Sequence, residues 1–240
     1  MIDALHVPPA EVDAPVVEGP PPLEPLAVLD GQEVTVEECG EPLVELDDEV
    51  RCLNLYRVDG WAGVPERTWV RAGVLERLVF AQSLLPDGFT LAAFDGWRST
   101  DTVRALYDHF YGPGSTLAPG FLADPDDPTV VPPHLTGAAV DLTLAWQGTA
   151  LALGTHFDDF TERSWVHSLE VAARSSAGRD DLPPEPDRSL RRLLHAVMRA
   201  AGFVGMREEW WHFSYGDQRW AEAERRSTAL YGAARPGPPS

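Results

Sequence analysis

The sequence predicts an α+β domain in which a small antiparallel sheet is flanked by helices. Short apolar strands are mixed irregularly with amphipathic helices, without the regular repeats of strand, helix and strand that build parallel sheets. The chain has 240 residues, of which 44% are hydrophobic, so it is long enough to bury one sizeable core. These two observations define the fold class, and the elements expected along the chain support it.

Composition divides the chain into three parts. Residues 1–45 are acidic and rich in proline, and we expect a flexible or loosely docked arm. Residues 46–225 contain the periodic apolar patterns, and we expect them to form the folded domain. Residues 226–240 end in Arg235-Pro-Gly-Pro-Pro-Ser240, a composition typical of a C-terminal tail.

The first half of the domain predicts a helix, a strand and a second helix. Apolar residues between Val70 and Leu85 lie near one helical face, and Pro86-Asp-Gly88 ends this helix. Thr90–Phe94 predicts a short strand, and Ser99 is expected to cap the second helix. The apolar residues expected on the buried faces of the two helices are Val70, Val74, Leu75, Leu78, Val79, Leu85, Val103, Leu106, Tyr107 and Phe110.

The second half predicts a long loop, two strands and a helix. Residues 112–133 contain many Gly, Pro and Asp residues, and long loops in compact domains are often functional. Ala138–Leu144 and Trp210–Tyr215 predict strands. Between them we expect a helix that begins near Ser189 and ends at Gly202.

Charge and cysteine content narrow the possible partners. The formal net charge is −19, and an acidic chain repels phosphate backbones, which argues against a nucleic-acid partner. No apolar stretch is long enough for a bilayer, and the N-terminus lacks the pattern of a secretory signal. The 2 cysteines have no metal-ligand spacing and are expected to be free thiols. We therefore expect a soluble cytoplasmic protein that binds no membrane; the sequence does not predict its oligomeric state.

Two histidines and one aspartate carry the candidate metal chemistry. His134 and Asp141 lie in one segment, and His212 follows later on another expected strand. Zinc accepts imidazole nitrogen and carboxylate oxygen, and three protein ligands leave a fourth position for water. This set predicts one catalytic Zn²⁺ per chain.

Two further side chains complete a hydrolytic mechanism. Glu209 is expected to act as general base on the metal-bound water, and Arg98 to stabilise the oxyanion. Residues three apart on a regular strand point to opposite faces, so Glu209 and His212 can share a site only if the chain bends just before Trp210.

Simpler structural roles remain open for each of these residues. His134 could be an ordinary loop residue, and the segment Glu209–His212 could be an aromatic surface strand. Arg98 could form an ion pair with Asp95 or Asp101. No spacing matches HExxH.

Two other histidines, His109 and His195, are expected to be exposed on their helices and to take no part in the site.

The two motifs resemble those of the VanX-type D-alanyl-D-alanine dipeptidases, which belong to a larger family of zinc DD-peptidases. The family pattern SxHxxGxAxD followed by ExWH is matched by Pro132–Asp141 and Glu209–His212, except that proline replaces the first serine. Asp95-Gly-Trp-Arg98 is similar to the family segment with the transition-state arginine. The resemblance covers roughly residues 45–220 and implies the zinc DD-peptidase fold, zinc and the roles given above.

The resemblance also implies a substrate. Asp158 stands where the family has an aspartate that binds the free ammonium group of a dipeptide. The family serine replaced by Pro132 is thought to hold the substrate carboxylate, so that contact is expected to differ here. The implied activity is that of a metallopeptidase acting on D-alanyl-D-alanine or a similar dipeptide in cell-wall metabolism. The alternatives are a wall-directed DD-carboxypeptidase or peptidoglycan endopeptidase, and a zinc-binding module without catalysis.

Overall fold

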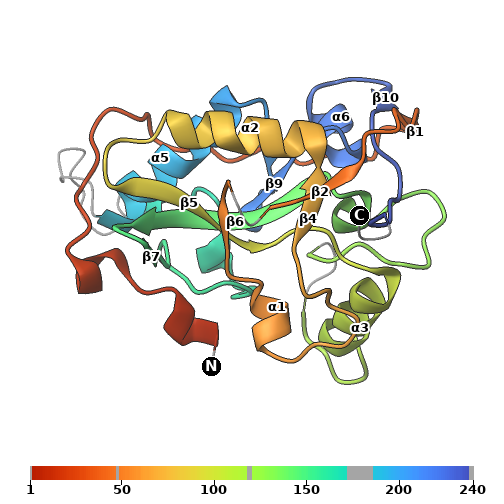
Figure 1. The fold of residues 1–240 in the computed structure, drawn as a ribbon, viewed down its shortest axis with the longest axis horizontal. Helices are drawn as coiled ribbons and strands as arrows, with labels where there is room; N and C mark the ends of the chain where they lie inside the picture. Colours follow the sequence, from red (N-terminus) through yellow and green to blue (C-terminus); the bar gives the residue numbers. More distant parts are fainter. Residues whose placement is uncertain (1, 47–48, 118–120, 172–185, 238–240) are drawn as a thin grey trace.

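A six-stranded sheet forms the centre of the computed structural model, which describes residues 2–46, 49–117, 121–171 and 186–237 (Figure 1). The strand order is β3-β5-β6-β9-β8, with β7 paired to β6. The bounds are β3 Arg51–Cys52, β5 Phe89–Asp95, β6 Ala139–Trp146, β7 Thr149–Ala150, β8 Val204–Gly205 and β9 His212–Ser214. All pairings are antiparallel except that of β3 with β5. The α+β class is therefore confirmed, with one parallel pairing at the sheet edge.

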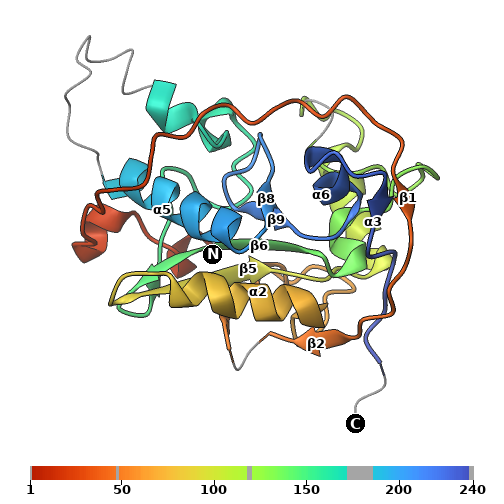
Figure 2. The same cartoon turned by 90° about the horizontal axis from the view of Figure 1, so that it is seen from above.

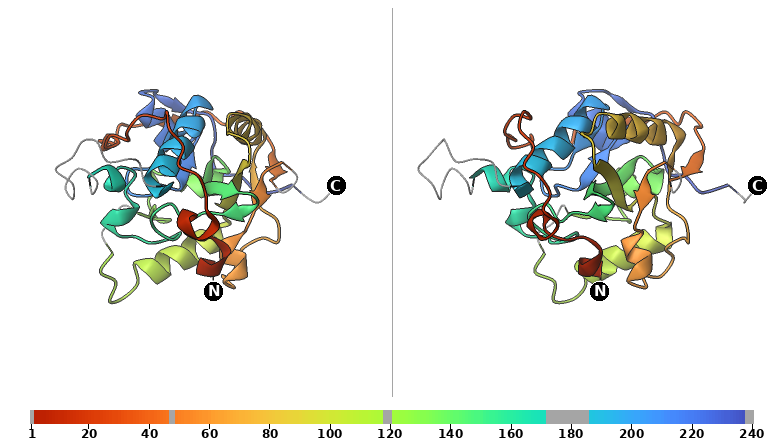
Figure 3. Two further views of the ribbon diagram at one scale, coloured as in Figure 1. Left: turned by 90° about the vertical axis from the view of Figure 1, so that its left-hand side faces the viewer. Right: turned by 60° about the vertical axis from the view of Figure 1, so that its left-hand side comes forward.

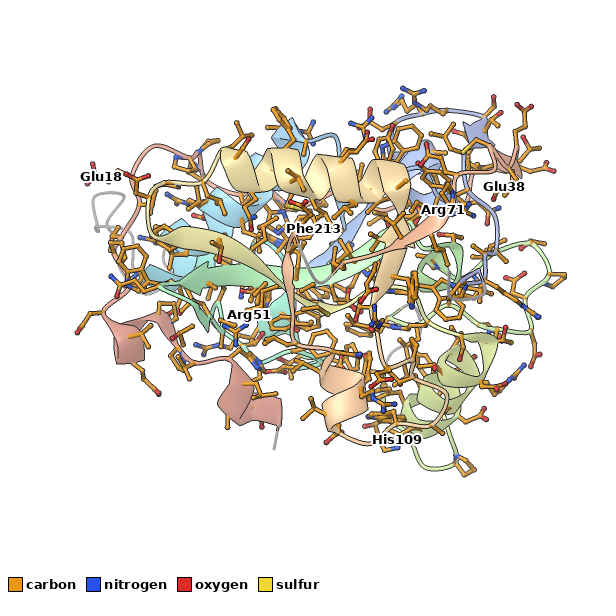
Figure 4. The ribbon with its side chains drawn as sticks, viewed as in Figure 1. Glu18, Glu38, Arg51, Arg71, His109 and Phe213 are labelled. Carbon is orange, nitrogen blue, oxygen red and sulfur yellow. The ribbon has the colours of Figure 1, made fainter. Side chains whose placement is uncertain are left out.

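Helices cover the sheet and bury its apolar face. Helices α2 and α5 contact each other and lie side by side above the strands (Figures 1 and 2). The apolar core lies between these helices and the sheet, and Figure 4 marks the core residue Phe213 there. The helix bounds are α1 Leu55–Val58, α2 Ala72–Ser83, α3 Thr100–Phe110, α5 Pro186–Ala200 and α6 Gln218–Ala223. None of the helices in the described ranges has the length and apolar character that a bilayer crossing requires.

Several expected elements are present with different ends. Val70 lies in strand β4 (Trp69–Arg71), and α2 begins only after it. The prediction that Val79 is buried is wrong, since it is 37% exposed on the outer side of α2. Ser99 caps α3 as expected, because its hydroxyl accepts a hydrogen bond from the Thr102 amide.

The exposed position expected for His195 is wrong. His195 is only 8% exposed, because the buried face of α5 is wider than its row of apolar residues and includes polar side chains. Its Nε2 lies 3.2 Å from the Trp210 carbonyl oxygen, and its ring packs on Phe213. His109 is exposed as expected, near the outer end of α3 (Figure 4).

The N-terminal residues follow the surface of the domain for a long distance (Figures 2 and 3). Val7 forms a β-bridge with Leu151, and strand β1 (Thr35–Val36) pairs with β10 (Thr228–Ala229). Strand β2 (Leu43–Glu45) then pairs with β4. Between these strands Glu38 accepts two hydrogen bonds from the buried Arg71, a pair labelled in Figure 4. The segment is thus joined to the domain at separate points, while the boundaries 1–45, 46–225 and 226–240 stay a prediction.

Candidate active site

Three neighbouring strands bring the candidate ligands to one level of the sheet. Asp95 on β5 is paired with Asp141 on β6, and Asp141 is paired with His212 on β9. Side chains at paired positions lie on the same face of a sheet. The register of β5 shifts between Ala93 and Asp95, and such a bulge turns the next side chain toward a different face.

His134, Asp141 and His212 form a compact group of possible metal ligands. One donor atom from each side chain lies within 4.8 Å of the others, and all three residues are buried. The His212 Nδ1 is 3.0 Å from Asp141 Oδ1. The His134 Nε2 is 3.4 Å from Asp141 Oδ2 and 3.3 Å from the His212 Nδ1. The structure therefore brings together the three residues that the sequence proposed.

Each imidazole has a hydrogen-bond partner at the ring nitrogen that faces away from Asp141, and this contact directs its other nitrogen toward Asp141. His134 Nδ1 lies 2.7 Å from the Gly96 carbonyl oxygen, so it carries the proton and leaves Nε2 free to bind a cation. His212 Nε2 lies 3.3 Å from the Ser214 hydroxyl, which leaves Nδ1 facing Asp141. Such outer hydrogen bonds fix the tautomer and ring orientation of metal-binding histidines.

A sharp turn presents His134 to the strands. The residue lies in the 3-10 helix Pro133–Thr136, which ends at Gly137 in the left-handed conformation with a φ of 72°. A Cβ atom at Gly137 would also collide with Leu43. The left-handed backbone therefore favours glycine here, and any larger residue would also require the Leu43 side chain to move.

Arg98 joins two carboxylates of the site. Its guanidinium donates to Asp95 and to Asp141, each at 2.6 Å, and is almost completely buried. The bridge to Asp95 was one of the simpler roles considered above, and Asp141 is an additional partner. Burial alone would raise the pKa of Asp141, but His134, His212 and Arg98 hold it well below its usual range. Asp141 is thus an anion, as a carboxyl group must be in order to bind a metal ion.

The bend that Glu209 requires lies in a hydrogen-bonded turn. The His212 amide donates to the Glu209 carbonyl oxygen at 3.4 Å, and β9 begins only at His212. Trp210 and Trp211 occupy the turn and are completely buried, which anchors it in the core. Both Glu209 and His212 consequently line the same cavity. Burial, together with the carboxylates of Asp141 and Asp158, raises the pKa of Glu209 well above its ordinary value.

Asp158 lies in the same cavity and is held by a tyrosine. The Tyr56 hydroxyl donates to Asp158 Oδ2 at 2.8 Å, and the Tyr56 ring lies 4.9 Å from the guanidinium carbon of Arg98. Burial raises the pKa of Asp158 to about 7, and nearby aspartates add to the effect of burial. Asp158 has a φ of 59°, an uncommon conformation for a residue other than glycine.

Tyr56 is a candidate functional residue that sequence reasoning missed. It belongs to the short helix α1, distant in sequence from the motifs, and a single buried tyrosine usually belongs to the core. The Ser214 hydroxyl beside His212 was missed as well. Neither residue carries a sequence signal of its role, because both act through contacts formed only on folding.

The cavity has a volume of about 750 Å³, within the range typical of small-molecule sites. Its lining includes Pro132, His134, Asp158 and Glu209, and also residues between Leu29 and Val34 from the N-terminal part of the chain. Helix α6 contributes Gln218, Arg219 and Glu222. The arrangement combines a possible cation site, a buried carboxylate of raised pKa and charged groups of both signs, which suits hydrolysis of a small polar molecule.

The part of the chain that contains the site is similar in sequence to known peptidases. A model of the Peptidase_M15 family, described as D-ala-D-ala dipeptidase, matches residues 65–228, which include all the site residues expected from the sequence. A D-alanyl-D-alanine dipeptidase of Synechocystis sp. is 30% identical over 216 residues, which cover 78% of this chain and 87% of the relative. The D-alanyl-D-alanine dipeptidase of Escherichia coli is 39% identical over 127 residues, which cover 52% of this chain and 55% of the relative.

Proposed function

Since the chain belongs to the M15 family of D-Ala-D-Ala dipeptidases and is a peptidase, we propose that it hydrolyses D-alanyl-D-alanine or a closely similar dipeptide with one bound zinc ion. The observation that carries this proposal is the convergence of His134, Asp141 and His212. Two imidazole nitrogens and one carboxylate oxygen are a donor set that zinc accepts in hydrolases. A bound zinc ion in such a site lowers the pKa of water and polarises a carbonyl group.

Glu209 is the proposed general base. It takes a proton from the attacking water and later delivers it to the leaving amine. Its position in the cavity supports this role, and its raised pKa makes the carboxylate a stronger proton acceptor.

Arg98 is the proposed stabiliser of the negative charge that develops on the scissile carbonyl oxygen. It lines the cavity, and its two ion pairs hold the guanidinium in a fixed orientation. A donor fixed before the reaction stabilises the oxyanion without reorganisation during the step.

Asp158 is the proposed contact for the free ammonium group of the substrate. A half-buried carboxylate that also accepts the Tyr56 hydroxyl can pair with an unblocked N-terminus. Such a pair favours dipeptides over longer chains blocked at this end. Cys39 and Cys52 form no disulfide among the described residues, which is compatible with action in the reducing cytoplasm, and we include this location in the proposal.

The test combines metal analysis with a substitution at Glu209. The purified protein is expected to bind one zinc ion per chain and to release alanine from D-Ala-D-Ala. Glu209→Gln is expected to lower kcat by at least about 100-fold, the contribution typical of a general base, while zinc content stays the same. The matched control is Glu208→Gln, which makes the same chemical change outside the cavity.

The possible results separate the candidate functions. A protein that binds zinc but cleaves no member of a panel of D- and L-dipeptides would contradict the proposal and favour a binding module. Cleavage of peptidoglycan fragments in preference to dipeptides would favour a wall-directed enzyme. Equal activity of both glutamine variants would remove Glu209 from the mechanism.

A further inference from the structure

Two arginines line the cavity among the residues that the structure describes, and only one has an anionic partner. Arg98 donates to Asp95 and Asp141. Arg219 forms neither a hydrogen bond nor an ion pair with any residue of the described ranges, and it is half-buried. A cation that faces a cavity without a counter-charge from the protein is available to an anionic ligand.

The backbone that carries Arg219 is held in place from several directions. The Gln218 side chain donates to the carbonyl oxygens of Val34 and Thr129 and accepts from the Val131 amide. Asp217 caps α6 by accepting from the Trp220 amide at 2.8 Å. The backbone at Arg219 is therefore fixed on the cavity wall, although its side chain has no hydrogen-bond or ion-pair partner within the described part of the chain.

The nearest acidic residue on α6 is already engaged. Glu222 accepts hydrogen bonds from the amides of Gly31 at 2.7 Å and Gln32 at 3.1 Å. Its carboxylate holds the N-terminal segment on the cavity wall and forms no ion pair with Arg219. Arg219 thus remains the cation available on this side of the cavity.

Glu209 is within electrostatic reach of both Arg219 and Asp158. Burial is the main cause of the raised pKa of Glu209; Asp158 adds to the rise and Arg219 opposes it. Burial is also the main cause of the raised pKa of Asp158. Arg98 and the Tyr56 hydroxyl lower this pKa, and Asp141 and Asp95 raise it. The cavity therefore offers a carboxylate and a free guanidinium, and the proposed base interacts with both.

We propose that Arg219 binds the C-terminal carboxylate of the dipeptide substrate. A dipeptide is a zwitterion at neutral pH, and Asp158 and Arg219 provide the cavity with one partner for each of its ends. Arginine suits a carboxylate because its planar guanidinium donates two parallel hydrogen bonds. Pro132, which also lines the cavity, has neither a hydroxyl nor an amide hydrogen to offer. This inference rests on the proposed function and extends it to the specificity of the enzyme.

The test compares D-Ala-D-Ala with its C-terminal amide, which lacks the carboxylate charge. The wild-type zinc enzyme is expected to prefer the free dipeptide in kcat/KM. Arg219→Gln should raise the KM of the free dipeptide by at least about tenfold, since hydrogen bonds to charged groups contribute more than neutral ones. The same substitution should change kcat/KM for the amide little. Arg219→Lys, which keeps the charge, should restore part of the preference.

The control is Arg225→Gln, which removes one positive charge from an exposed residue outside the cavity. It is expected to leave the preference unchanged. An Arg219→Gln enzyme that still discriminates between dipeptide and amide as the wild type does would overturn the role of Arg219, as would a wild-type enzyme that cleaves both equally. Failure of the wild-type enzyme to cleave either compound would instead contradict the proposed function.

Discussion

The carboxylate of Asp141 faces two imidazoles and a guanidinium at the same time. An isolated buried carboxylate would be costly, and these neighbours compensate for its burial. The same neighbours keep it ionised, as a metal ligand requires. At the scale of single residues, the site is therefore a network of side chains in which the charge of Asp141 is stabilised by Arg98 and the two imidazoles.

Tyr56 offers a test of this network at a single hydroxyl group. Tyr56→Phe removes the hydrogen bond to Asp158 and keeps the ring beside Arg98. We expect the KM for D-Ala-D-Ala to rise roughly tenfold, while kcat changes less, because the bond holds the partner of the substrate ammonium. Steady-state kinetics provide the measurement, and Tyr107→Phe on α3, outside the cavity, is the control. An unchanged KM would show that Tyr56 does not position Asp158 for binding.

Among the elements, the turn before β6 depends on the conformation and the packing of one glycine. Gly137 has a positive φ, and a Cβ atom added there would collide with the Leu43 side chain. Gly148, in the turn that follows β6, also has a positive φ but no atom near its missing Cβ. Substitutions at the two positions therefore distinguish the free-energy cost of backbone strain, which both share, from the cost of the collision, which occurs only at Gly137.

Gly137→Ala is expected to lower the free energy of unfolding by more than Gly148→Ala. Backbone strain costs about 1–3 kcal/mol at either position, and the collision with Leu43 adds to it only at Gly137. Urea unfolding of both variants measures the difference. Equal losses would mean that the collision is relieved by a small shift of Leu43.

The sequence predicted the elements better than it predicted their ends. The helix expected from Val70 begins after β4, because periodicity alone does not separate a buried strand residue from a helical one. The strand expected from Trp210 is shorter, because the two tryptophans form the turn that Glu209 requires. His134, Asp141 and His212 could be proposed from motifs, whereas Tyr56 and Arg219 enter the cavity through tertiary contacts that have no local signal.

For the whole molecule, His195, which is buried between α5 and the sheet, links stability to pH. Burial lowers the pKa of His195 to about 3, and the charge of Arg191 acts in the same direction. The unfolded chain, with a histidine pKa of about 6.5, binds a proton that the folded chain excludes between these values. Stability should therefore fall as the pH is lowered from about 6.5 toward 3.

This single group is expected to remove about 3 kcal/mol of the free energy of unfolding between pH 7 and pH 4. His195→Gln, which can still donate to the Trp210 carbonyl, should lose that part of the pH dependence. Urea unfolding at several pH values measures it, with the exposed His109→Gln as control. Identical pH profiles for wild type and His195→Gln would show that His195 is not responsible.

The wall of the cavity contains residues from near both ends of the chain. Leu29 and residues 31–34 line it, and Gln218 and Glu222 of α6 bind the Val34 carbonyl oxygen and the Gly31 amide. During synthesis on a ribosome, residues 29–34 emerge about 190 residues before the side chains of α6 that bind them. A nascent chain that has not yet reached α6 consequently lacks a finished binding chamber.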